Sequence, residues 1–122
     1  MQNTSLNAQT NLKGAPENPP TKILTILREL QKLDNDFPLQ YAICLLEISQ
    51  NEGITITALS KKSGIALSTI SRIVGALSTS RQKGKAYGLV DVRIHPKERR
   101  KKELYLTTAG HDLIERLTKI TA

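Results

Sequence analysis

Basic side chains gathered in one segment are the most pronounced chemical feature of this sequence. The window from residue 81 to residue 102 holds nine Lys or Arg residues and two acidic ones, Asp91 and Glu98, so it carries a charge of +7. The whole 122-residue chain also has a net charge of +7, so the remainder is neutral. Such a concentration of positive charge is typical of a surface that binds a polyanion, above all nucleic acid. A solvated basic loop and a membrane surface are the alternatives.

Hydroxyl and guanidinium side chains precede this window at helical spacing. Apolar residues recurring every three to four positions predict a helix over residues 67–80. On its outward face, hydroxyl groups can hydrogen-bond phosphates or base edges, and an arginine can contact phosphate or the O6 and N7 atoms of guanine. The side chains that we expect to contact DNA from this helix are Ser68, Thr69, Ser71 and Arg72. An ordinary surface helix with a few hydroxyl groups is the alternative.

A shorter helix before this one completes a helix-turn-helix pattern. Thr57 is predicted to cap it, and Gly64 is predicted to end it. A tight connection from Ile65 then leads into the helix at 67–80. In a helix-turn-helix the first helix lies over the DNA backbone, and the second presents its outward face to the major groove.

A basic hairpin follows. Alternating apolar and polar residues predict strands at 88–94 and 103–106, which enclose a charged tip at 95–102. Beside a helix-turn-helix such a hairpin is a wing, and a wing can insert arginine into the minor groove. Its expected DNA contacts are Lys97, Arg99, Arg100, Lys101 and Lys102. Lys83 and Lys85, in the joint at 81–87, either add phosphate contacts or belong to a mobile solvated loop.

The remaining segments predict one domain behind a polar leader. Residues 1–20 are rich in Asn, Gln, Thr and Pro, which favours a disordered leader, and residues 21–122 are predicted to form a single winged helix-turn-helix domain. The expected fold class is mainly α (α+β), with a short three-stranded antiparallel sheet. In chain order the other predicted elements are a helix from 21 to about 34, a helix opened by Pro38 and buried around most of its girth, a short strand at 54–56, and a last helix capped by Thr107 or Thr108.

Few residues suit other chemistry. Cys44 is expected to be a small core residue or, alternatively, a redox sensor. His95 and His111 have no ligand partners at metal-binding spacing, so we expect no metal, and His95 is expected to be a phosphate contact or a surface residue at the end of a strand. With no nucleophile–base arrangement and no phosphate-binding glycine loop, we expect neither an enzyme nor a cofactor. No apolar run suits a membrane helix and no secretory signal begins the chain, so we expect a cytoplasmic, nucleoid-associated protein.

Several of these segments, taken in order, resemble signatures of the MarR family of winged-helix regulators. The resemblance covers about residues 22 to 117, although Glu98 stands where the family usually has aspartate. The segments are Phe37–Tyr41, Leu59–Ile65, Ser68–Val74, Glu98–Arg100 and Leu106–Gly110.

The resemblance implies a homodimer, formed through helices 22–34 and 108–121, whose two recognition helices enter successive major grooves of double-stranded DNA. It also implies that Arg100 enters the minor groove and that Glu98 holds it in place. The predicted function is therefore a sequence-specific transcription regulator, and of the two kinds of regulator a repressor is favoured over an activator. The alternatives are a plasmid or phage accessory protein for DNA partition, replication or packaging, and a winged-helix module that binds an acidic protein.

Overall fold

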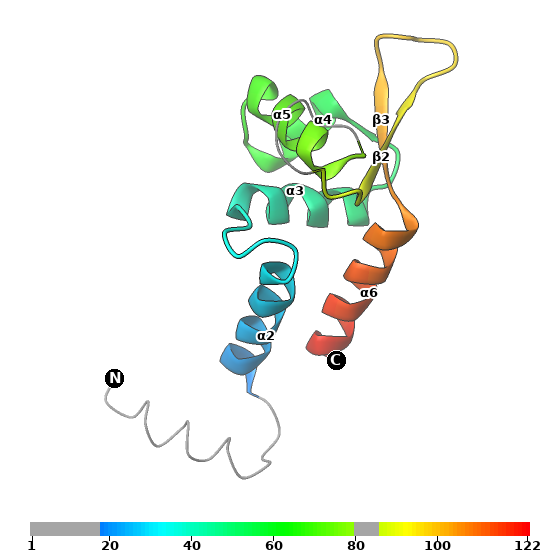
Figure 1. The fold of residues 1–122 in the computed structure, drawn as a ribbon. Helices are drawn as coiled ribbons and strands as arrows, with labels where there is room; N and C mark the ends of the chain where they lie inside the picture. The colour runs from blue at the N-terminus through cyan, green and yellow to red at the C-terminus, as the bar shows by residue number, and fades with distance from the viewer. Residues whose placement is uncertain (1–17, 80–85) are drawn as a thin grey trace.

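Five helices and one three-stranded sheet make up the part of the chain that the computed structural model describes, residues 18–79 and 86–122 (Figure 1). The mainly α fold and the predicted order of elements are confirmed. Within the described residues, no helix combines the length and the apolar character needed to cross a membrane. The elements are α2 (Pro19–Gln31), α3 (Leu39–Gln50), β1 (Ile54–Thr55), α4 (Ile56–Ser63), α5 (Leu67–Leu77), β2 (Val90–Ile94), β3 (Lys102–Leu106) and α6 (Thr108–Thr121).

Helix α2 begins earlier than predicted. The side chain of Asn18 accepts a hydrogen bond from the backbone N–H of Thr21, 2.9 Å away, and two prolines occupy the first helical positions. Both features favour a helix start, because proline has no N–H to leave unsatisfied in a first turn. The predicted leader at 1–20 is therefore wrong in its last three residues, and residues 1–17 lie outside the described part of the chain.

The start of α4 also differs from the prediction. Thr55, rather than Thr57, caps this helix by accepting a hydrogen bond from the backbone N–H of Ala58 at 3.1 Å. Ile56 is consequently the first residue of α4, and β1 contains only two residues. The reason is that β1 pairs with β3 at Ile54 and Thr55 only, so the extended backbone ends at Thr55.

The turn between α4 and α5 agrees with the prediction. Gly64 ends α4 in the left-handed conformation, with φ at 76°, which favours glycine. The hydroxyl group of Ser60 donates a hydrogen bond to the carbonyl oxygen of Ile65 at 2.6 Å, so the turn is also held by a side chain.

Helix α5 ends at Leu77, before its predicted end at residue 80. The carbonyl oxygens at its end accept hydrogen bonds from the segment that enters β2, including one from the N–H of Leu89 to Leu77 at 2.8 Å and one from the N–H of Tyr87 to Ala76 at 3.0 Å. These bonds replace a further helical turn. They also attach the start of the hairpin directly to the end of α5.

The sheet has the order β1-β3-β2, and both pairings are antiparallel, as predicted. In the hairpin, Val90 lies opposite Leu106 and Ile94 lies opposite Lys102. Because strand side chains alternate between the two faces of a sheet, this register turns Val90, Leu104 and Leu106 into the core.

Helix α3 is less buried than its sequence suggests. Cys44, Leu45 and Ile48 are fully buried and contribute to a single core with residues of the other elements. Leu39, however, is 70% exposed, and Leu46 is 39% exposed. The prediction of a helix buried around most of its girth is therefore wrong, because no described element covers this face of α3.

Helices α2 and α6 pack side by side and extend away from the body on the side opposite the hairpin tip (Figure 1). An ion pair joins Arg116 Nε of α6 to Glu29 Oε1 of α2 at 3.4 Å, and Lys22 Nζ donates to the carbonyl oxygen of Ala122 at 3.2 Å. The hydrogen bond from Lys32 is the main cause of the lowered pKa of Glu29, to which Arg116 also contributes.

The junction between β3 and α6 is tightly packed. Thr107 caps α6, its hydroxyl group donates to the carbonyl oxygen of Gly88 at 2.7 Å, and its N–H donates to that of Leu89 at 3.0 Å. Gly110 lies so close to the Leu89 carbonyl oxygen that a Cβ atom would overlap it.

Gly110→Ala is therefore expected to lower the free energy of unfolding by about 2 kcal/mol, because the backbone would have to move. Gly75→Ala is the matched control, since a Cβ atom there meets open space in α5. That change is expected to stabilise the protein by about 0.5–1 kcal/mol, the usual gain for alanine over glycine in a helix. Urea unfolding followed by circular dichroism measures both, and equal stabilisation by the two changes would contradict the packing at Gly110.

Candidate nucleic-acid interface

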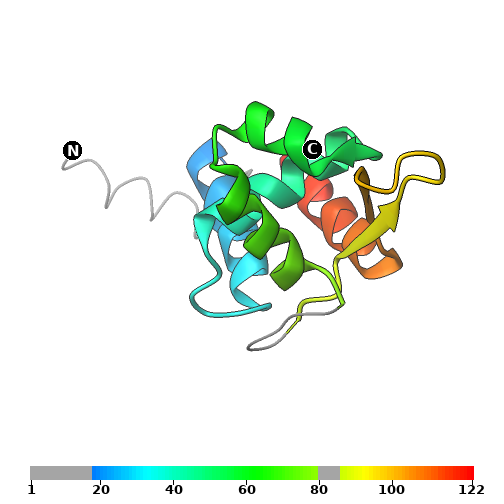
Figure 2. The ribbon, with the colours of Figure 1, turned by 90° about the horizontal axis from the view of Figure 1, so that it is seen from above.

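The helix-turn-helix and the wing line one open groove. It has a volume of about 590 Å³ and lies between the start of α4, the start of α5 and the wing tip. Figure 1 shows α4, α5 and the hairpin at the end of the molecule opposite α2 and α6, and Figure 2 shows the same arrangement from above. The polar residues that line the groove are Thr55, Thr57, Lys61, Ser71, Arg100, Lys101 and Lys102.

Helix α5 presents the predicted polar face to solvent. Ser68, Ser71 and Arg72 are exposed, and Thr69 is half-buried. The opposite face of the helix is buried in the core, as its apolar spacing predicts. Side chains that can hydrogen-bond base edges are therefore held on a helix whose own position is fixed by packing.

The predicted cations of the wing are all exposed. All five lie between residue 97 and the first residue of β3, so their charges are close together along the chain. Within the described residues the ion pair at the tip is that of Lys101 Nζ with Glu98 Oε1, at 4.0 Å. The exposed cations are Lys97, Arg99, Arg100, Lys101 and Lys102.

The contact implied between Glu98 and Arg100 is not found among the described residues. Glu98 faces Lys101 instead, because the backbone N–H of Lys101 donates to the Glu98 carbonyl oxygen at 2.9 Å and closes a turn that brings the two residues together. The expectation that Glu98 orients Arg100 is therefore wrong for this structure.

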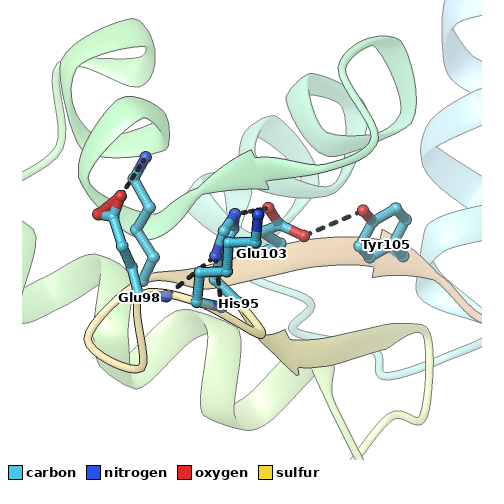
Figure 3. A network of polar contacts seen from close by, with 6 residues as sticks. His95, Glu98, Glu103 and Tyr105 are labelled. Atoms are coloured by element: carbon cyan, nitrogen blue, oxygen red, sulfur yellow. Dashed lines mark hydrogen bonds and ion pairs between the residues drawn. The ribbon is translucent and has the colours of Figure 1, made fainter.

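His95 lies at the base of the wing tip (Figure 3). Its Nδ1 atom accepts hydrogen bonds from the backbone N–H groups of Lys97 and Glu98, both at 3.1 Å. Its Nε2 atom is 3.9 Å from Glu103 Oε2. Of its two predicted roles, the strand-end position agrees with the structure, since His95 directly follows the last residue of β2, but its side chain is only 28% exposed and so is partly covered.

Polar contacts continue along the hairpin from His95. The hydroxyl group of Tyr105 donates to Glu103 Oε1 at 3.2 Å, as Figure 3 shows. Burial raises the pKa of Tyr105, and the Glu103 carboxylate raises it further. The guanidinium group of Arg93 lies 4.0 Å from the centre of the Tyr105 ring and pairs with Asp91 at 3.0 Å. Arg93, one of the nine basic residues between 81 and 102, therefore makes its contacts within the hairpin.

Sequence reasoning missed the contribution of α4 to the groove. Lys61 and Thr57 line it, although the sequence analysis assigned no DNA contact to either residue. The available signal was the Lys61–Lys62 pair in the first helix of the helix-turn-helix pattern. The predicted contacts Lys83 and Lys85 lie outside the described residues.

In the described part of the chain, no three potential metal ligands gather. Each histidine faces a carboxylate, His95 that of Glu103 across the hairpin and His111 that of Glu52, which is distant in sequence. His111 Nε2 is 3.3 Å from Glu52 Oε2, while the other oxygen of Glu52 accepts the backbone N–H of Leu106 at 2.8 Å.

Cys44 is a core residue. Its side chain has no solvent exposure, and burial raises the pKa of its thiol to about 11. Because the thiolate is the reactive form of cysteine, both features oppose a redox-sensing role.

A protein-family model matches the segment that contains α4 and α5. The family model described as "Winged helix-turn-helix DNA-binding" matches residues 45–78, from α3 to the end of α5. MarR is 25% identical in sequence, with a TM-score of 0.61 over 85% of this chain and 76% of that protein. No curated protein sequence matches this chain.

Two solved DNA complexes have the same fold. MepR of S. aureus, in complex with DNA, is 21% identical with a TM-score of 0.64, over 77% of this chain and 70% of MepR. The transcriptional repressor CouR, bound to a 23-mer duplex, is 23% identical with a TM-score of 0.57, over 80% of this chain and 65% of CouR.

The fold and the groove are those of a winged helix-turn-helix, the architecture that the matched family model describes as DNA-binding. Within that class the fold is similar to that of MarR and of the DNA-bound MepR and CouR.

The thiol of Cys44 is expected to react with a disulfide reagent at pH 8 at least roughly a hundredfold more slowly in the folded protein than in urea. The reason is that a thiol with a pKa of about 11 forms little thiolate at that pH and is also shielded. Release of the coloured thiolate from the reagent measures the rate. Equal rates in the two states would contradict the core role and favour a sensor.

Proposed function

We propose that this chain is a sequence-specific transcription repressor that binds double-stranded DNA of the nucleoid, with α5 in the major groove and the wing in the minor groove. The observation that supports this proposal most strongly is that Ser71 of α5 and Arg100 of the wing line the same groove. A curved, cationic surface of this kind can contact bases with one element and the backbone with its neighbours.

Helix α5 is the proposed reader of base sequence. The major groove of B-DNA is wide enough to admit a helix, and its base edges distinguish all four base pairs. Ser68 and Ser71 are short and exposed, so they allow the helix to approach the bases, and Arg72 is long enough to contact a guanine. Thr69, which is half-buried, is proposed to contact the DNA backbone.

The wing supplies most of the proposed electrostatic contacts. Arg99 and Arg100 are the proposed minor-groove residues, because the negative potential of a narrow minor groove attracts arginine. The lysines of the wing, together with Lys61 of α4, are proposed to contact phosphates on either side. Lys83 and Lys85 are proposed as further phosphate contacts. Loss of affinity with added salt should follow, since each phosphate contact releases counterions.

Helices α2 and α6 are the proposed dimer interface, within residues 22–34 and 108–121. Large apolar side chains stand exposed on α2, with Ile23 at 58%, Leu24 at 50% and Leu27 at 47%. Leu24 and Leu27 border a groove of about 440 Å³ together with Leu39 and Ala42 of α3, and exposed apolar surface of this kind usually marks an interface. A two-fold axis there would direct the two copies of α5 toward half-sites about one helical turn apart.

Arg72→Ala is expected to weaken binding to a site selected from random duplex by about tenfold or more, because a bidentate arginine–guanine contact contributes about 1–3 kcal/mol. Its effect on random duplex should be small. Fluorescence anisotropy with both duplexes measures this, and Gln50→Ala is the control, since Gln50 is exposed at the end of α3 and belongs to neither the proposed DNA surface nor the proposed dimer interface. Equal losses on the two duplexes would show that Arg72 contacts only phosphate.

The double change Leu24→Lys and Leu27→Lys is expected to convert a dimer into a monomer, because it places charges in the proposed apolar interface. Sedimentation equilibrium measures the mass. Ile94→Lys is the matched control, since Ile94 is 59% exposed but lies on the wing, and it should leave the dimer intact. A dimeric double variant would rule out this interface, and a monomeric wild-type protein would rule out the homodimer.

A further inference from the structure

The side chain of His95 closes the turn at the wing tip from the inside. Its Nδ1 atom is the acceptor for two consecutive backbone N–H groups, those of Lys97 and Glu98, each at 3.1 Å. Its own backbone N–H donates to the carbonyl oxygen of Lys101 at 2.9 Å. One residue therefore contacts both arms of the tip, and the two N–H groups that it accepts directly precede Arg99 and Arg100.

A carboxylate of the neighbouring strand lies on the other side of the ring. Because Nδ1 accepts hydrogen bonds, the proton of the neutral ring is on Nε2, which faces Glu103 at 3.9 Å. Glu103 is in turn held by the hydroxyl group of Tyr105 at 3.2 Å. Both facing side chains are largely covered, with His95 28% and Glu103 25% exposed, and Figure 3 shows the carboxylate beside the ring.

The tip needs such a restraint. Its five cations repel one another, and the ion pair found there among the described residues spans 4.0 Å between Lys101 and Glu98, both more than half exposed. An exposed pair of this kind contributes little to stability. Ordering an otherwise free loop costs about 1–2 kcal/mol of backbone entropy per residue, and a protein that orders the loop in advance does not lose that free energy on binding.

We propose that His95 is a positioning residue for DNA binding: its Nδ1 acceptor holds the wing tip in the conformation that presents Arg99 and Arg100 to the duplex. This inference rests on the proposed function of the wing. His95 itself touches no DNA in this proposal and acts only through the backbone of the tip.

Two substitutions separate the acceptor from the rest of the ring. His95→Asn keeps an oxygen acceptor near the place of Nδ1, whereas His95→Gln puts its amide near the place of Nε2 and leaves both N–H groups without an acceptor. Amide hydrogen exchange by NMR in the free protein should show that Lys97 and Glu98 lose protection in the Gln variant and keep it in the Asn variant. Equal protection in all three proteins would overturn the proposal.

Affinity for the selected duplex is the second measurement. His95→Gln is expected to weaken binding by about tenfold, while His95→Asn stays within about twofold of wild type, because loop ordering is the quantity that changes. In a protein that also carries Arg99→Ala and Arg100→Ala, His95→Gln should have an effect below about twofold. An equal loss in both backgrounds, or an equal loss for Asn and Gln, would overturn the positioning role.

These outcomes are distinguishable from a failure of the proposed function. A wild-type protein that ignores duplex at low salt would refute DNA binding and, with it, the role of His95 in binding. The exchange of the Lys97 and Glu98 amides would still show whether the imidazole orders the tip, since that measurement contains no DNA. Thermal unfolding by circular dichroism serves as the control for folding, and it should give similar midpoints for both variants.

Discussion

The hydrogen bonds between the end of α5 and the start of the hairpin are the constraint on which the rest of the site depends. The carbonyl oxygens of Ala76, Leu77 and Ser78 accept from the N–H groups of residues 87–89, so the wing begins where the reader helix ends. Thr107 ties the returning strand to the same segment. The distance between α5 and the wing is thus set by backbone bonds, and the surface side chains of both elements can differ without changing it.

This attachment produces a molecule with two different ends. Positive charge collects at the end formed by α4, α5 and the wing, where the groove is lined by Lys61, Arg100, Lys101 and Lys102. At the other end Glu29 pairs with both Arg116 and Lys32. The exposed apolar side chains of α2 also lie there. Long-range electrostatic attraction therefore favours approach of a polyanion from one side and leaves the other side available for apolar association.

The division of labour within the groove follows from side-chain length and order. The hydroxyl groups on α5 are short, so they can reach a partner only if the helix itself comes close to it. The position of this helix is fixed by the core into which Ile70 and Ile73 pack. The cations of the wing have long, flexible side chains and no core beneath them, so the order of the tip comes from the polar contacts of His95, Glu103 and Tyr105. Rigid packing suits selectivity among bases, whereas flexible charge suits attraction to phosphate.

The sequence by itself determined the features that depend on neighbouring residues: the helical and alternating apolar patterns, the glycine that ends α4, the threonine that caps α6, and the position of the positive charge. Only the tertiary structure decided the features that depend on distant residues. The pairing of β1 with β3 made Thr55 the cap of α4, and the bond from Leu89 to Leu77 ended α5. The partner of Glu98 and the acceptor role of His95 likewise arise from the turn at the tip. Local patterns carry no information about which segment will return to satisfy a given backbone group, because that depends on the packing of the whole chain.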